Sequence, residues 1–88
     1  MIFDAVPKIR ALRIDSDLRY DDLLEFVAGT YYVINWWYDI DHEYRHLNHM
    51  DKDEFIDLDR VGYLVYKGNP DKLRFLDDDE FNERYRVV

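Results

Sequence analysis

Residues 18–38 read LRYDDLLEFVAGTYYVINWWY, and this stretch joins two segments of different periodicity. In its first half, apolar residues recur at the spacing i, i+3, i+4 and i+7 of one helix face: Tyr20, Leu23, Leu24 and Val27. Two acids in the first turn and Gly29 after the last favour a helix over about 19–28. The second half, 30–38, is β-branched and aromatic almost throughout, which predicts a strand. Because both faces of this strand carry large apolar groups, we expect it to be central, or to present one face to a partner.

Shorter patterns on both sides of this stretch predict additional strands. Alternation or β-branched composition favours strands at about 8–14, 54–59 and 63–67. The turn sequence GNPD at 68–71 predicts a hairpin between 63–67 and 72–76. Asp77 and Glu80 have the spacing of a capping box, so a short helix follows, and 86–88 can end the chain as an edge strand. The polar segment 39–53 gives no clear prediction.

The order of these elements predicts an α+β fold over residues 1–88 as a single domain. In it, an antiparallel sheet packs against one main helix at about 19–28, with a short C-terminal helical turn at about 78–84. The expected core consists of Ile9, Leu12, Ile14, Leu23, Leu24, Val27, Val33, Ile56, Leu58, Leu64, Tyr66, Phe75, Phe81 and Tyr85.

Composition and charge exclude several classes of function. Twenty acidic residues against twelve basic give a net charge of −8, which disfavours direct binding to a nucleic-acid backbone. Without cysteine the chain can form no disulfide, thiolate zinc site or iron–sulfur cluster. No apolar stretch approaches the roughly 20 residues that span a membrane, so we expect no membrane partner and a cytoplasmic location. No motif predicts a cofactor.

Both ends of the chain resemble a type of small tailed-phage and prophage protein. The resemblance rests on PKIRALRI at 7–14, DDLLEFV at 21–27, VGYLVYKG at 61–68, LRFL at 73–76 and DEFNERYRVV at 79–88. Tyr63 departs from that pattern, because an acid usually follows the glycine. The resemblance implies a phage or prophage origin, the host cytoplasm as location and a compact α+β fold, but no reaction.

His42, Glu43 and His46 match the zinc-protease pattern H-E-x-x-H. That chemistry needs both histidines one turn apart on a helix, whereas the preceding run favours a strand. On a strand, His42 and His46 lie about 13 Å apart and cannot share one ion. We therefore expect no metal site and no catalytic residues here, with metal binding by His42 and His46 as a remote alternative.

Acidic residues concentrate in the centre of the chain. Residues 36–61 hold eight acids and three bases, a net charge of −5, against −2 for 1–35 and −1 for 62–88. On a strand, Asp57 and Asp59 would project from one face about 7 Å apart, a spacing that can imitate successive phosphates. Other acids could extend that row: Asp39, Asp41, Glu43, Asp51, Asp53 and Glu54. The alternative is a solvated face that only keeps the protein soluble.

Trp36, Trp37, Tyr38 and Tyr44 form a group of aromatic residues, and the adjacent Trp36 and Trp37 stand at the edge of this acidic segment. Neighbouring residues on a strand point to opposite faces, so at most one of the two belongs to the main core. An exposed tryptophan ringed by charge is typical of a protein-binding hot spot, although aromatic residues of small domains are most often packed.

Together these patterns predict a small acidic, phage-encoded protein-binding module without enzymatic activity. We expect an inhibitor or adaptor, similar to an anti-CRISPR protein or a DNA mimic, that acts on a host nucleic-acid-handling or defence protein as a monomer or small homo-oligomer. The residues expected to bind that partner are Trp36, Trp37, Asp39, Asp41, Glu43, Asp53, Asp57 and Asp59. The alternative is a minor structural or accessory phage protein.

Overall fold

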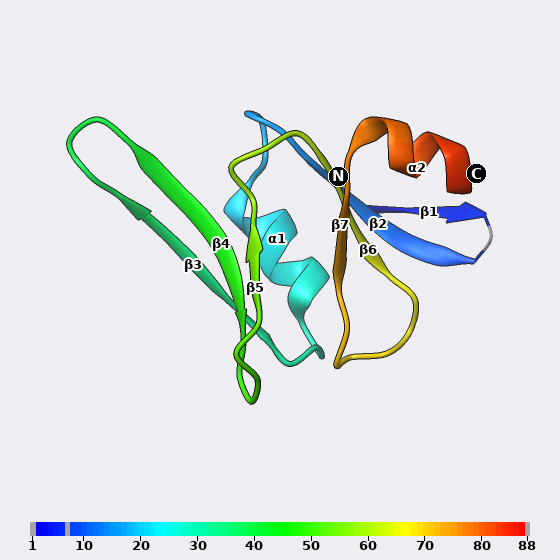
Figure 1. Cartoon of the computed structure of the whole chain (residues 1–88), viewed down its shortest axis with the longest axis horizontal. Coiled ribbons are helices and arrows are strands. Elements are labelled where there is room, and N and C mark those ends of the chain that lie inside the picture. The colour runs from blue at the N-terminus through cyan, green and yellow to red at the C-terminus, as the bar shows by residue number, and fades with distance from the viewer. Residues whose placement is uncertain (1, 7, 88) are drawn as a thin grey trace.

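The computed structural model describes residues 2–6 and 8–87 and shows two antiparallel sheets with two helices (Figure 1). This arrangement confirms the predicted α+β class. The elements are β1 (Ile2–Val6), β2 (Ile9–Ile14), α1 (Tyr20–Val27), β3 (Tyr32–Tyr38), β4 (Glu43–His49), β5 (Phe55–Asp57), β6 (Gly62–Tyr66), β7 (Arg74–Leu76), α2 (Asp78–Arg84) and β8 (Arg86–Val87). Of the expected strand 86–88, residue 88 lies outside the described residues.

The strands form a five-stranded sheet, in the order β7-β6-β2-β1-β8, and a three-stranded sheet, in the order β3-β4-β5. Helix α2 packs on one face of the five-stranded sheet, while α1 and the three-stranded sheet lie against the other (Figure 1). The hairpin of β3 and β4 extends beyond the rest of the molecule as a twisted arm (Figure 1). This arm lengthens the molecule to extents of 40 × 28 × 21 Å.

Two apolar clusters fill the two faces of the five-stranded sheet. The larger joins that sheet to α1 and the three-stranded sheet: Leu12, Ile14, Leu18, Leu23, Phe26, Val27, Tyr32, Leu47, Ile56, Leu58, Leu64 and Leu73. The smaller lies under α2: Ala5, Ile9, Ala11, Val65, Leu76, Phe81 and Tyr85. Strands β2 and β6 contribute to both clusters because alternate side chains of a strand point to opposite faces.

Most of the predicted core is confirmed, but the prediction that Leu24 and Val33 are buried is wrong. Helix α1 buries Leu23, Phe26 and Val27, whereas Leu24 is 51% exposed. The helix of eight residues buries a stripe centred one position away from the predicted one, so Phe26 takes the place assigned to Leu24. Val33 is 42% exposed because it lies on the face of the three-stranded sheet that no element of the described residues covers.

The ends of the helices agree with the sequence. Gly29 has φ +81°, a left-handed conformation that favours glycine and ends α1. Before α2, the Asp77 carboxylate accepts the backbone N–H of Glu80 at 2.8 Å, and the Glu80 carboxylate accepts that of Asp77 at 3.3 Å. The predicted capping box is therefore present. Strands β1 and β4 were not predicted. Strand β3, expected to be central or to present one face to a partner, is not central but lies at the edge of its sheet.

Candidate binding surface on the three-stranded sheet

The uncovered face of the three-stranded sheet brings together side chains from three strands. Its register pairs Trp37 with Tyr44, and Asn35 with His46 and through it with Asp57. Since paired residues of neighbouring strands share a face, one surface carries every second residue of each strand. We call it the outer face: Val33, Asn35, Trp37, Tyr44, His46, Asn48, Phe55 and Asp57.

Aromatic rings on the outer face contact one another in the open. Trp37 stacks on Tyr44 with ring centroids 4.2 Å apart and planes inclined by 23°. The ring of His42 meets Tyr44 edge-on at 4.3 Å, and His46 lies 4.6 Å from Phe55. Trp37 is 49% exposed and Phe55 58%. These pre-assembled rings form an exposed apolar surface of the kind that marks a binding site.

Trp36 points the other way, into the core. Its ring lies 5.7 Å from that of Tyr20 and 5.6 Å from the guanidinium of Arg45. Its buried Nε1–H has no hydrogen-bond partner within the described residues. Of the two tryptophans, Trp37 is therefore the one that a partner can reach.

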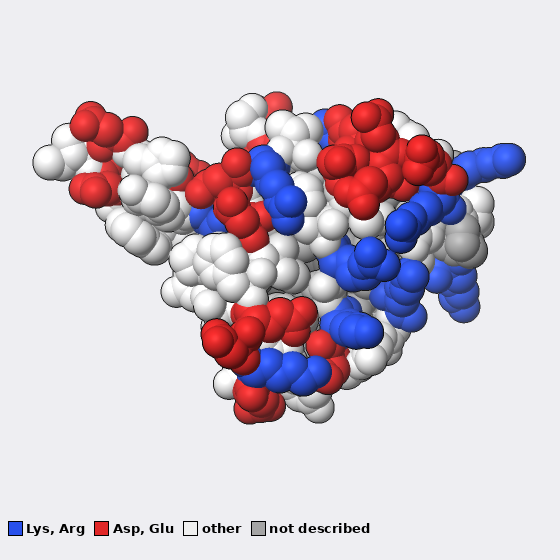
Figure 2. Space-filling view, in the orientation of Figure 1, with Lys and Arg blue, Asp and Glu red and all other residues white. Residues whose placement is uncertain are grey.

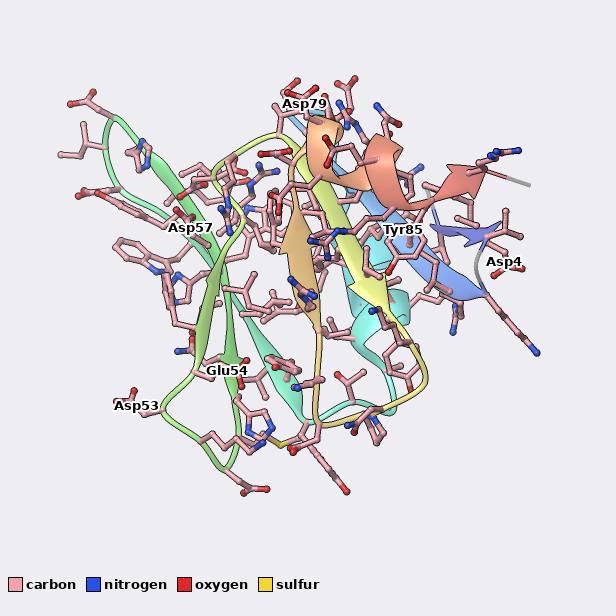
Figure 3. All side chains as sticks on the ribbon, turned by 45° about the vertical axis from the view of Figure 1, so that its right-hand side comes forward. Asp4, Asp53, Glu54, Asp57, Asp79 and Tyr85 are labelled. Atoms are coloured by element: carbon pink, nitrogen blue, oxygen red, sulfur yellow. The ribbon has the colours of Figure 1, made fainter. Side chains whose placement is uncertain are left out.

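Four of the expected acids lie exposed at the margins of the outer face. Asp39 and Asp41 are at the tip of the β3–β4 hairpin, beside Ile40, which is 95% exposed. Figure 3 shows Asp53 and Asp57 at opposite ends of β5, Asp53 at the turn that precedes it and Asp57 at its last residue. We call these four residues the rim acids. Their negative charge surrounds the aromatic rings on both sides.

Glu43 and Asp59, by contrast, accompany a buried cation on the inner side of the sheet. Arg45 is only 9% exposed, and its Nε lies 3.8 Å from Glu43 Oε1 and 3.7 Å from Asp59 Oδ1. Its terminal nitrogens donate to the carbonyls of Asp15 at 3.0 Å and Leu58 at 2.8 Å. These two carboxylates therefore help to neutralise Arg45.

The strand expected over 54–59 ends earlier, at Asp57. Asp57 Oδ1 accepts the backbone N–H of Asp59 at 2.8 Å, which turns the chain away from β5. Asp57 and Asp59 thus do not follow each other along one strand, and the expected row of evenly spaced carboxylates is not formed.

The segment that matches H-E-x-x-H is extended. His42 precedes β4, and Glu43 and His46 lie within it, so the helical spacing that a zinc protease requires is absent from these residues. Glu43 points inward to Arg45, whereas His46 faces outward. Within the described residues, no group of three or more His, Asp or Glu side chains is placed to hold a metal ion.

The turn between β4 and β5 is fastened to the turn at 69–72. His49, whose side chain is fully buried, lies with its Nε2 2.6 Å from Asp71 Oδ1, and Lys52 reaches the other oxygen of the same carboxylate. The His49 Nδ1 accepts the backbone N–H of Asp51 at 3.0 Å and that of Lys52 at 3.1 Å. Hydrogen bonds from Lys52 and His49 hold the pKa of the Asp71 carboxyl below its ordinary value.

The residues predicted to bind a partner did not include Tyr44, His46 and Phe55, although Tyr44 was grouped with the two tryptophans as an aromatic candidate. The only signal was the alternation in EYRHLNH at 43–49, where polar residues occupy both faces. Once Trp37 is known to face outward, the antiparallel register assigns the other three residues to the same side.

Charge is unevenly spread over the molecule. Figure 2 shows acidic side chains on the hairpin arm, around β5 and over α2. Basic side chains gather on the side where β1, β2, β6 and β7 lie.

Neither helix in the described part of the chain has the length and apolar character that crossing a membrane requires. In comparisons with known proteins, no family model, curated protein or solved structure matches this chain.

Proposed function

We propose that this chain is a protein-binding module of phage or prophage origin. Its partner is a host protein whose basic surface handles nucleic acid or serves defence, and the chain acts on it in the host cytoplasm as an inhibitor or adaptor without catalysis. The single observation that supports binding is the exposed Trp37–Tyr44 stack between rim acids at both ends of the outer face. The resemblance at both ends of the chain supports the phage origin.

The two kinds of residue contribute to different steps of binding. The rim acids attract a basic surface over a distance and speed encounter, because the rate of association depends on long-range charge. Trp37 and Phe55 lose water on contact and hold the complex together, because desolvated aromatic residues contribute most to slow dissociation. In this way the rim acids take the place that phosphates occupy on the partner's surface.

The first test identifies the partner by pull-down from host lysate and then measures its association rate against salt. Changing all four rim acids to asparagine (Asp39, Asp41, Asp53 and Asp57) should slow association about tenfold at low salt and flatten the salt dependence. Asp59 stays unchanged, because its loss would disturb Arg45.

The matched control removes the same charge elsewhere. Asp21→Asn, Glu25→Gln, Asp79→Asn and Glu83→Gln together lower the negative charge by four on the exposed sides of the two helices. This variant should associate nearly as fast as the wild type. Equal association rates and salt slopes for the wild type and the rim-acid variant would contradict the proposal.

A second variant tests the aromatic contact. Trp37→Ala should raise the dissociation rate about thirtyfold, the equivalent of about 2 kcal/mol at a hot spot. Leu24→Ala, which removes an equally exposed apolar side chain from α1, should leave dissociation unchanged. If the two variants dissociate alike, the outer face is not the interface. A stable high-order oligomer of the protein alone would instead favour the structural phage protein.

A further inference from the structure

The four edges of the two sheets differ in length. In the described residues, three edge strands are short: β5 and β7 have three residues each and β8 has two. The fourth, β3, has seven. Because an exposed edge invites pairing with another chain, proteins commonly keep edge strands short. Strand β3 is the exception in this fold.

The β3 edge also lacks the residues that usually protect an edge strand. Its sequence, YVINWWY, contains no proline and no charged residue, although 36% of the whole chain is charged. Lysine and proline are the common means of blocking edge-to-edge pairing. Charge begins only at Asp39, after the strand has ended.

The register shows which backbone groups face the open side. Met50 donates its N–H to the carbonyl of Tyr31, and Asp39 donates to that of His42, so the odd-numbered residues of β3 bond to β4. Hydrogen-bonded and non-hydrogen-bonded pairs alternate along an antiparallel pair of strands. The backbone groups of the even-numbered residues therefore point away from β4: Tyr32, Ile34, Trp36 and Tyr38.

One of these groups already has a partner within the protein. The N–H of Tyr32 donates to the hydroxyl of Thr30 at 3.3 Å. The open edge therefore offers the N–H groups of Ile34, Trp36 and Tyr38 and the carbonyls of Tyr32, Ile34 and Trp36. This is a ladder ready to accept one more strand.

Acids lie at both ends of this ladder. Beyond Tyr38, the hairpin tip carries Asp39 and Asp41. At the other end, Met50 pairs with Tyr31, so the turn that follows brings Asp51 and Asp53 to that end of the sheet. An antiparallel second copy of this chain would set its own acidic tip near this turn, where like charges repel. A strand with basic ends meets opposite charge at both.

We propose that the β3 edge accepts an extended segment of the partner, neutral and β-forming in its middle and carrying Lys or Arg at both ends. This inference rests on the proposed function and specifies its mode of recognition. The added strand would lie beside Val33, Asn35 and Trp37, so its outward side chains continue the outer face. Backbone hydrogen bonds would supply affinity, while the aromatic rings and the flanking acids would select the sequence.

Amide hydrogen exchange by NMR tests the edge directly. The probe is the blocked peptide Lys-Arg-Val-Thr-Val-Thr-Val-Arg-Lys, and its control has glutamate in place of every Lys and Arg. At saturating probe, the amides of Ile34, Trp36 and Tyr38 should exchange at least about tenfold more slowly, and the control peptide should not change them. Unchanged exchange at these three amides would overturn the inference.

The same experiment without peptide decides whether a second copy occupies the edge. At pH 7, the three amides should exchange fast at every protein concentration. If they become protected as protein concentration rises, a second copy holds the edge, and the proposal of a basic partner segment is wrong.

A proline variant separates the edge from the outer face. Tyr38 is 71% exposed and its N–H faces the open side, so Tyr38→Pro removes an edge donor without breaking a bond to β4. This variant should bind the probe at least about fivefold more weakly, while Tyr38→Ala, which keeps the N–H, should bind as the wild type does. If both variants lost the same affinity for the probe, the peptide would contact only the Tyr38 side chain, and the proposal of strand addition would be overturned.

The pulled-down partner then distinguishes failure of this inference from failure of the proposed function. Binding that is lost on Trp37→Ala but unaffected by Tyr38→Pro would leave the outer-face interface standing and refute strand addition. Binding unaffected by both variants would refute both. Loss of binding in both, with Tyr38→Ala unaffected, is the expected result.

Discussion

Arg45 is the residue on which the inner side of the three-stranded sheet depends most. It is the most deeply buried cation of the described chain, and it connects three segments that are distant in sequence. Its guanidinium satisfies the carbonyls of Asp15 and Leu58 and lies over the ring of Trp36. A planar group with five donors can serve all of these at once, which a lysine ammonium cannot.

We therefore expect Arg45→Met to lower the free energy of unfolding by about 3 kcal/mol, because it leaves buried carbonyls without donors and two carboxylates without their cation. Arg45→Lys should recover only part of this loss. Urea unfolding followed by far-ultraviolet circular dichroism measures both. The control is Arg10→Met, at an exposed position of β2. Its free energy of unfolding should stay within about 0.5 kcal/mol of the wild type. A similar small effect at Arg45 would show that its contacts do not stabilise the fold.

At the scale of single residues, the sequence predicted which residue types belong to the core or the surface better than it predicted the direction in which each side chain points. It showed that Trp36 and Trp37 must face opposite sides, but which of them faces out depends on the sheet packed beneath β3. The prediction that Leu24 and Val33 are buried was wrong for the same reason. Both are apolar residues in regular elements, and only tertiary contacts decide which side of each element is covered.

Among the elements, the β4–β5 turn and the 69–72 turn act as one unit through Asp71. The carboxylate of Asp71 accepts a hydrogen bond from His49 on one oxygen and from Lys52 on the other. Tyr31 adds a backbone hydrogen bond from its N–H to the carbonyl of Pro70 at 2.9 Å. The three-stranded sheet is thereby tied to the loop that joins β6 and β7.

The lowered pKa of Asp71 predicts how this tie depends on pH. A carboxyl whose folded pKa lies below its unfolded value stabilises the fold above the unfolded value, 3.8, and loses that contribution as pH falls through the folded pKa. Asp71→Asn should therefore lower the melting temperature at pH 7, and the difference from wild type should shrink below pH 3.8. Thermal unfolding from pH 7 to pH 2 measures this. Asp53→Asn is the control from the adjoining turn, and an Asp71→Asn deficit that persists unchanged at pH 2 would contradict the assignment.

At the scale of elements, the hairpin of β6 and β7, both helices and β2 could be predicted because turn and cap signals mark their ends. Strand β4 could not, since its inward side chains include Arg45 and His49 as well as Leu47. Such polar residues are buried only because Asp15 and Asp71 satisfy them from elsewhere in the chain. Long-range partners of this kind leave no local pattern.

For the whole molecule, net charge is the main protection that the β3 edge has against other copies. At neutral pH each chain carries −8, and like charges keep copies apart. This repulsion disappears near the isoelectric point of about 4.6.

Light scattering should therefore show a monomer at pH 7 and growing association as pH approaches 4.6. Tyr38→Pro should suppress that association, because it removes an edge donor without changing net charge. Tyr38→Ala is the control and should associate as the wild type does. If the proline variant associates equally, copies meet through another surface.

The two apolar clusters meet back to back on β2 and β6, and this arrangement has a consequence for how the protein comes apart. Neither cluster can lose its order without removing one wall of the other, so we infer that both melt in one cooperative transition. The tip of the β3–β4 hairpin, residues 39–42, lies beyond both strands and belongs to neither cluster. The tip can open and close many times during the lifetime of the folded core, so Asp39 and Asp41 can sample several poses before a partner selects one.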